Sequence, residues 1–166
     1  MVEDGEPLSE DDARILGLES ESITGHTLKL MMLEPGDQPL DLDRLRSTVG
    51  DRLAGQPRAT ERVAQDADGP RWVRDDAFDI DAHVRRRTAP EPITPEELWR
   101  TVSELMGEHL DHQRPLWTFD VIGPLSDGRE VIAARIHHAM ADGIAGVRFL
   151  DAVLFDPRAD RPAGAA

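Results

Sequence analysis

The sequence predicts an α/β domain, because segments with the periodicity of strands and segments with the periodicity of helices are interspersed along the chain. Alternating or β-branched runs typical of strands lie at 26–33, 117–122 and 129–137. Apolar residues at helical spacing lie at 41–55, 94–110 and 144–154. With 39% hydrophobic residues among 166 and only 4% aromatic ones, the chain has enough apolar residues for one largely aliphatic core.

The N-terminal segment, residues 1–22, is acidic and is expected to contain one short helix. Ser9 followed by Asp12 is a capping signal for this helix, which should end near Gly17. Eight acidic side chains against the one basic residue, Arg14, make up about half of the net charge of −14. Such an acidic chain is not expected to bind nucleic acid, and it offers no basic patch for anionic lipid.

The next part of the chain is expected to contain a strand and a second helix. Residues 26–33, HTLKLMML, alternate and predict the strand. Asp41 can cap the helix, and Gly55 would close it. One face of this helix would carry the apolar residues Leu42, Leu45, Val49 and Leu53. Residues 56–70 are predicted to be a polar connection.

The second half of the chain is expected to contain a helix, a hairpin and a last helix. Thr94-Pro95-Glu96-Glu97 has the residues of a capping box with proline in the first turn. The helix that follows would bury the stripe Leu98, Val102, Leu105, Met106 and Leu110. Strands 117–122 and 129–137 would form a hairpin around Gly123 and Asp127-Gly128. The last helix would present Ile144, Val147, Leu150 and Leu154 at helical spacing.

The most informative motif is HHxxxDG, formed by His137-His138 and Asp142-Gly143 at the end of the last predicted strand. A free histidine has a pKa near ~6.5, so much of it is available as a base at neutral pH. Successive strand residues face opposite sides, so the two histidines would diverge. The positive end of the following helix would keep a nearby imidazole neutral. Adjacent histidines can be purely structural, but this spacing at a strand-to-helix junction favours a catalytic site.

Three further segments accompany the motif. They are PRWVRDDAFDIDAHVRRRTAP (70–90), QRPLW (113–117) and HHAMADGIAG (137–146), with a weaker LSEDDARILGLES at 8–20. Together they resemble the N-terminal half of the bacterial wax ester synthase/diacylglycerol acyltransferase family, and the resemblance covers nearly the whole chain. The HHxxxDG motif is shared with other acyltransferases and with peptide-synthetase condensation domains. The segments FDIDAHVRR and RPLW point to this family in particular.

The resemblance implies a CoA-dependent acyltransferase-like (chloramphenicol acetyltransferase-like) α/β sandwich, a mixed sheet flanked by helices, as one domain of a normally two-domain enzyme. The implied reaction transfers a fatty acyl group from acyl-CoA to diacylglycerol or a long-chain alcohol. In this family the second histidine of the motif is the general base and the aspartate organises the site. The catalytic residues would therefore be His138 as the base, with His137, Asp142 and Gly143 beside it. Gly143, Ala145 and Gly146 would let the substrate approach the helix start.

The same resemblance sets the expected ligands and partners. No permanently bound cofactor and no metal site are expected, acyl-CoA is the co-substrate, and the CoA-binding residues are not identified. Partners would be a C-terminal half domain or a second copy of the chain, with possible peripheral contact at a membrane or lipid droplet. The expected division is an acidic segment at 1–22, the acyltransferase domain at 23–155, and a linker or tail at 156–166.

The chain departs from the family pattern at several points, and two alternatives stay open. Thr118 follows Trp117 where an acidic residue is expected. The segment before Trp72 is commonly rich in arginine, but residues 57–69 of this chain contain few arginines. The resemblance also implies that the chain covers only the first of two domains. One alternative is a truncated or non-catalytic half that acts as a binding module. The other is a condensation-domain-like enzyme that uses an amine acceptor.

The remaining candidate residues carry weaker signals. Trp72 and Trp117 are expected in the core, and His83 is expected to be structural. The cluster Arg85-Arg86-Arg87 is either a solvated edge or a ligand site. His109 and His112 flank a helix end, and His26 begins a strand with no evident partner. The absence of cysteine excludes disulfides and thiolate chemistry, and the lack of a signal sequence or an apolar run of ~18 residues predicts a cytoplasmic protein.

Overall fold

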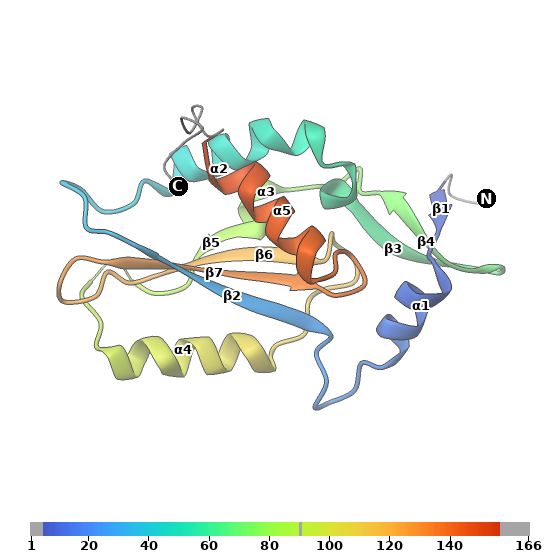
Figure 1. The fold of residues 1–166 in the computed structure, drawn as a ribbon, viewed down its shortest axis with the longest axis horizontal. Helices are drawn as coiled ribbons and strands as arrows, with labels where there is room; N and C mark the ends of the chain where they lie inside the picture. The colour runs from blue at the N-terminus through green and yellow to red at the C-terminus, as the bar shows by residue number, and fades with distance from the viewer. Residues whose placement is uncertain (1–4, 90, 157–166) are drawn as a thin grey trace, which may run out of the picture.

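The computed structural model describes residues 5–89 and 91–156, and its larger sheet has four strands in the order β2-β7-β6-β5 (Figure 1). These strands are β2 (His26–Leu33), β5 (Val84–Arg86), β6 (Trp117–Ile122) and β7 (Glu130–His137). Strand β5 runs parallel to β6, whereas the other neighbouring pairs are antiparallel, so the sheet is mixed. The expected strand at 26–33 and the expected hairpin of β6 and β7 are therefore confirmed.

A second, smaller sheet takes one strand and the start of another from residues 56–70, so the prediction of a polar connection there was wrong. Its strands are β1 (Gly5–Pro7), β3 (Glu61–Asp66) and β4 (Gly69–Arg74), in the order β1-β4-β3. Two short 3-10 helices, Leu53–Gly55 and Pro57–Thr60, lead into it. Strand β3 buries only Val63, and four of its six residues are polar or charged, so the sequence shows no strand periodicity there. Val63 packs with Trp72, a core residue as expected.

The described residues form α-helices at the four places where the sequence predicts one, and also at α3 (Ile80–His83), which was not predicted. The predicted helices are α1 (Glu10–Gly17), α2 (Leu42–Arg52), α4 (Pro95–Gly107) and α5 (Gly143–Leu154). Ser9 caps α1 by accepting the N–H of Asp12, and Asp41 caps α2 in the same way. Thr94 and Glu97 form the expected capping box of α4. The capping predictions are confirmed because these contacts depend only on residues three apart in the sequence.

The helices lie on both faces of the larger sheet, with α2 and α5 on one face and α4 on the other (Figure 1). Successive residues of β7 divide between the two faces as the alternation predicts. Ile132, Ala134 and Ile136 pack in the core beneath α2 and α5, and Val131 and Ala133 pack beneath α4. The expected α/β fold, a mixed sheet flanked by helices, is confirmed.

The apolar stripes noted in the sequence of the last two long helices are only partly buried, which corrects the expectation that Met106 belongs to the core. Helix α5 buries Gly146, Phe149, Leu150 and Val153, whereas Ile144 and Val147 are 69% and 55% exposed. In α4, Met106 is 44% exposed although Leu98 and Leu105 are buried as expected. Both helices carry apolar residues on more than one side, so helical spacing alone does not tell which stripe faces the sheet. Most of the expected tail at 156–166 lies outside the described residues.

Candidate active site

The HHxxxDG motif forms the connection between β7 and α5. Strand β7 ends at His137, a turn follows at 138–140, and α5 begins at Gly143. The carbonyl of His137 accepts the N–H groups of Met140 and Ala141, at 3.0 and 3.2 Å. These bonds close the turn tightly behind the strand. The strand-to-helix junction expected from the sequence is therefore present.

His137 is fully buried and holds this turn with its side chain as well as its backbone. Its Nδ1 accepts the N–H of Ala139 at 3.1 Å, and its Nε2 lies 2.5 Å from a carboxylate oxygen of Glu19. Burial is the main cause that lowers the pKa of His137, and the hydrogen bond to Glu19 opposes it. His137 is thus a neutral, enclosed imidazole with both ring nitrogens engaged.

His138, in contrast, is exposed, and its backbone N–H donates to the carbonyl of Gly25 at 2.9 Å. It borders a hollow of about 440 Å³ between α1 and the start of α5. The other residues around this hollow are Ser9, Asp11, Asp12, Ile15, Ala139, Met140, Ala141, Asp142 and Ala145. Of the two histidines, His138 is therefore the one that a substrate can reach in this structure.

Asp142 caps α5, and Gly143 is the first residue of the helix. The Oδ1 atom of Asp142 accepts the N–H of Ala145 at 2.8 Å, and its carbonyl accepts the N–H of Gly146 at 2.7 Å. These are the backbone hydrogen bonds expected of an organising carboxylate. A Cβ added to Gly143 would meet no described atom within 4 Å. Nothing in the described part of the chain therefore requires glycine at position 143.

Sequence reasoning missed the residues that contact the motif from the N-terminal segment. Asp11 and Asp12 line the hollow, and Glu19 binds His137. Gly25 has φ +70°, and a Cβ at this position would lie 2.3 Å from Nε2 of His137. These residues are more than a hundred positions from the motif in the sequence, so no local pattern relates them to it.

Glu19, His112 and His137 form a cluster whose side-chain nitrogen and oxygen atoms lie within 4.8 Å of one another. Two imidazoles and a carboxylate are ligands that zinc accepts. However, a metal on Nε2 of neutral His137 would put the ring proton on Nδ1, where the N–H of Ala139 also points. Two donors would then face each other. The geometry favours hydrogen bonds to Glu19, which also lies 2.9 Å from Nε2 of His112.

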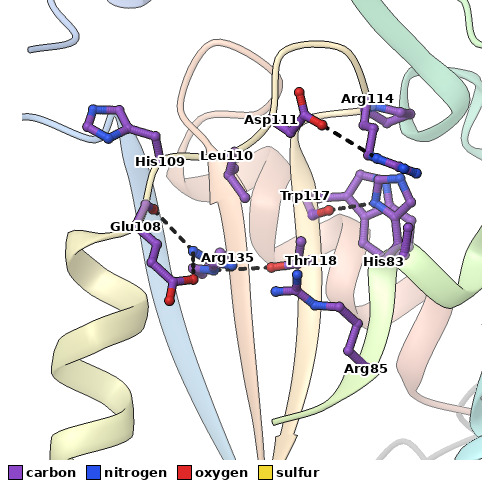
Figure 2. A pocket seen from close by; sticks show the side chains of 12 residues that line it. His83, Arg85, Glu108, His109, Leu110, Asp111, Arg114, Trp117, Thr118 and Arg135 are labelled. Carbon is purple, nitrogen blue, oxygen red and sulfur yellow. Dashed lines mark hydrogen bonds and ion pairs between the residues drawn. The ribbon is translucent and has the colours of Figure 1, made fainter.

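A second hollow, of about 310 Å³, lies at the same end of the sheet beside Trp117 (Figure 2). Arg135 is almost fully buried there and donates to Thr118 Oγ1 and to the carbonyls of Leu105 and Glu108. Thr118 in turn donates to the buried carboxylate of Asp120, which lies 3.6 Å from Arg135. Asp120, two residues after Thr118, therefore provides a carboxylate close to Arg135, whereas Thr118 itself provides only a hydroxyl group.

The arginine cluster at 85–87 forms structural ion pairs. Arg85 binds Asp120 at 2.7 Å and Arg86 binds Glu130 at 3.0 Å, while Arg87 pairs with Glu108. All three side chains are partly buried, so neither a solvated edge nor an open ligand site describes them. The arginine side chains in and around this second hollow pair with carboxylates of this chain. The hollow consequently has little uncompensated positive charge with which to bind an anion.

Two other histidines belong to the core. The ring of His83 stacks between Phe78 and Trp117, and its Nδ1 donates to the carbonyl of Trp117 at 2.7 Å. His26 is buried at the start of β2, and its ring nitrogens have no hydrogen-bond partner among the described residues. Burial lowers the pKa of each ring to about 4. The contacts of His83 are those of a structural residue, as expected.

Comparison of the sequence with known proteins shows the family to which this chain belongs. The model of the wax ester synthase/diacylglycerol acyltransferase catalytic domain matches residues 8–166. A Mycobacterium tuberculosis protein named as a diacylglycerol O-acyltransferase is 33% identical over 156 residues, which cover 91% of this chain and 33% of that protein. The chain thus spans about a third of the length of the curated relatives it matches.

Solved structures agree with this result. The wax ester synthase/diacylglycerol acyltransferase from Marinobacter aquaeolei VT8 matches with a TM-score of 0.70 and 25% identity, over 86% of this chain and 35% of that one. The X-domain from teicoplanin biosynthesis matches with a TM-score of 0.65 and 21% identity, over 84% of this chain and 29% of that one. The latter likeness is one of fold alone.

The fold and the HHxxxDG junction are those of an acyltransferase domain. Within this class, the chain belongs to the wax ester synthase/diacylglycerol acyltransferase family. Within residues 5–89 and 91–156, no helix is long and apolar enough to cross a membrane.

Proposed function

We propose that this chain is the histidine-bearing part of an O-acyltransferase that transfers a fatty acyl group from acyl-CoA to diacylglycerol or a long-chain alcohol. One observation carries the proposal. In a member of this family, His138 of HHxxxDG is exposed on a hollow at the strand-to-helix junction, whereas His137 is enclosed. The amine acceptor of a condensation domain is not proposed, because the likeness to those domains is one of fold alone.

The proposed chemistry needs one base and no covalent intermediate. The imidazole of His138 removes the hydroxyl proton of the acceptor while the hydroxyl oxygen attacks the thioester carbonyl of acyl-CoA. The carbon–sulfur bond then breaks, and the proton passes from His138 to the CoA thiolate, so the products are the ester and free CoA. A general base of this kind contributes roughly 10²–10⁴ in rate. No permanently bound cofactor takes part.

Asp142 and Gly143 support this step without touching the proton. Asp142 fixes the start of α5 through the N–H of Ala145, which holds the end of the turn that carries His138. Gly143 leaves open space at the first turn of the helix, on the side where a substrate would approach. Asp11 and Asp12 add negative charge around the hollow, which suits an uncharged hydroxyl acceptor better than the phosphates of CoA.

The remaining binding surface is proposed to come from outside this chain. Positioning of two substrates can be worth roughly 7–11 kcal/mol of the barrier, and one hollow beside one histidine does not supply it. Because the matched relatives are about three times as long, we propose a C-terminal half domain as the partner that completes the site. Diacylglycerol is insoluble in water, so the assembled enzyme would meet it at the surface of a membrane or lipid droplet.

The test is an acyl-transfer assay with palmitoyl-CoA and either diacylglycerol or hexadecanol. The 166-residue chain is assayed alone and with the separately expressed C-terminal remainder of the matched Mycobacterium tuberculosis relative. We expect almost no transfer by the chain alone and measurable transfer by the mixture. In the mixture, His138→Ala should lower turnover at least about 10²-fold, because the base is lost.

His137→Ala is the matched comparison, because it removes the neighbouring imidazole. We expect a smaller loss of rate and a larger loss of thermal stability, since this ring is buried and bonded to Glu19 and Ala139. Equal activity of His138→Ala and wild type would overturn the assignment of the base. Robust transfer by the chain alone, shown to be a monomer by light scattering, would overturn the need for a second half. No transfer in either preparation would contradict the proposed activity.

A further inference from the structure

The N–H of Ala139 determines which nitrogen of His137 carries the proton. A backbone N–H can only donate, so the Nδ1 that accepts it at 3.1 Å has a free lone pair. The proton of the neutral ring therefore sits on Nε2, which lies 2.5 Å from Oε1 of Glu19. The hydrogen bond on one side of the ring thus fixes the bond on the other.

Glu19 is placed to accept that proton in a largely enclosed position. Its side chain is 16% exposed, just beyond the end of α1. The same oxygen lies 2.9 Å from Nε2 of His112, so two imidazoles approach one carboxylate. Without this carboxylate, the Nε2–H of His137 would be buried with no acceptor, which is unfavourable. The ring could then turn or change tautomer, and Ala139 would lose its partner.

Gly25 couples the same segment to the other histidine. Its carbonyl accepts the N–H of His138 at 2.9 Å, and its Cα faces the ring of His137 so closely that a Cβ would lie 2.3 Å from Nε2. Residues 19–25 therefore contact both histidines of the motif, the first through a side chain and the second through the backbone. The direction of the His138 side chain depends on both contacts.

We propose that Glu19 is a positioning residue of the acyl-transfer site, which holds the Nε2–H tautomer of His137 and thereby the turn that presents His138. Its effect on turnover rests on the proposed function, whereas its effect on the ring of His137 does not. Glu19 touches no substrate, and it acts through His137 and Ala139. The cluster with His112 is a hydrogen-bonded network on this assignment, and it binds no metal.

The test combines a ring measurement on the 166-residue chain with kinetics in the reconstituted mixture. Long-range ¹H–¹⁵N spectra of imidazole nitrogens report the tautomer of His137. Wild type should show the Nε2–H form, and Glu19→Ala should show a mixture or the Nδ1–H form. In the mixture, Glu19→Ala should lower kcat by about 10- to 100-fold with little change in KM, because a small displacement of the base affects chemistry more than binding.

Glu19→Gln and Glu21→Ala are the matched variants. The glutamine keeps an oxygen that can accept the Nε2–H, so it should retain the wild-type tautomer and recover most of kcat. Glu21 is exposed two residues away, and its replacement should leave both readouts unchanged. Because Glu19→Gln preserves the shape of the side chain, it stays informative if Glu19→Ala does not fold.

Three outcomes would overturn the proposal. The first is a Glu19→Ala protein with the wild-type tautomer and wild-type kcat. The second is a Glu19→Gln protein that folds but loses the Nε2–H form. The third is stabilisation of the chain by Zn²⁺ that disappears in Glu19→Gln, which would make the cluster a metal site. A wild-type chain with the expected tautomer but no acyl transfer in the mixture would instead contradict the proposed function and support the assignment of His137.

Discussion

At the scale of single residues, Gly143 is a position where the described structure does not require glycine, so its replacement can test function apart from folding. It is the first residue of α5, its φ is not in the left-handed region, and a Cβ there would meet open space. Alanine is favoured over glycine inside a helix by up to about 1 kcal/mol. Glycine at this position therefore gives the chain itself no stability, and its role in substrate approach stays a prediction.

We predict that Gly143→Ala leaves the free energy of unfolding unchanged or raises it by a few tenths of a kcal/mol. In the reconstituted mixture, the same change should lower kcat/KM about tenfold or more, because the methyl group occupies space that a substrate needs. Urea denaturation and the acyl-transfer assay measure the two effects.

Gly50→Ala is the control for this prediction, because Gly50 lies within α2 and a Cβ there also meets open space. It should gain stability with no change in activity. A fully active Gly143→Ala enzyme would show that substrate does not approach the start of α5.

At the scale of elements, α5 depends on its first turn. Its N-terminus carries no acidic residue beyond the cap, so Asp142 supplies both the capping bond to Ala145 and the negative charge near the helix dipole. The same helix end closes the turn of His138. Loss of the cap should therefore affect stability and catalysis together.

We predict that Asp142→Ala lowers the free energy of unfolding by about 0.5–2 kcal/mol and the melting temperature by a few degrees. Asp142→Asn should retain most of the stability and most of the activity, because an amide oxygen can still accept the N–H of Ala145. Thermal denaturation and turnover in the mixture measure both variants. A stable but inactive Asp142→Asn protein would instead indicate that the carboxylate charge takes part in the chemistry.

The elements that the sequence predicts best are those set by local signals. The capping residues Ser9, Asp41 and Thr94 act within one turn, and strand β2 has the expected bounds. Strand β3 was missed because Val63 is its one buried residue and four of its six residues are polar or charged, so no alternation shows in the sequence. The buried face of α5 could not be predicted because the helix is apolar on several sides, and only packing against the sheet selects Phe149 and Val153.

At the scale of the whole molecule, the site combines a local motif with contacts that no local pattern contains. The positions and different environments of His137 and His138 follow from strand alternation and the following helix. Glu19 and Gly25 reach them only because β2 pairs with β7, which brings His26 opposite His137. This long-range pairing also creates the buried surroundings of His26.

The buried histidines make the stability of the chain sensitive to acid. In the unfolded chain, histidine binds a proton near pH 6.5, whereas the folded chain holds the pKa of His26 and His83 at about 4. Protons therefore bind preferentially to the unfolded state between these values, and the free energy of unfolding falls as the pH falls through this range. The lowered pKa of His137 acts in the same direction.

We predict that the free energy of unfolding decreases by roughly 2 kcal/mol for each of His26 and His83 between pH 7 and pH 5. Replacement of His26 by leucine should remove its share of this decrease, measured by urea denaturation at both pH values. At pH 7 the variant should be at least as stable as wild type, because the wild-type ring is buried and its nitrogens bond to no described residue.

Met32→Leu, an exposed change on the same strand without a titratable group, should keep the wild-type pH dependence. An unchanged pH dependence in His26→Leu would mean that His26 is protonated as readily in the folded chain as in the unfolded one.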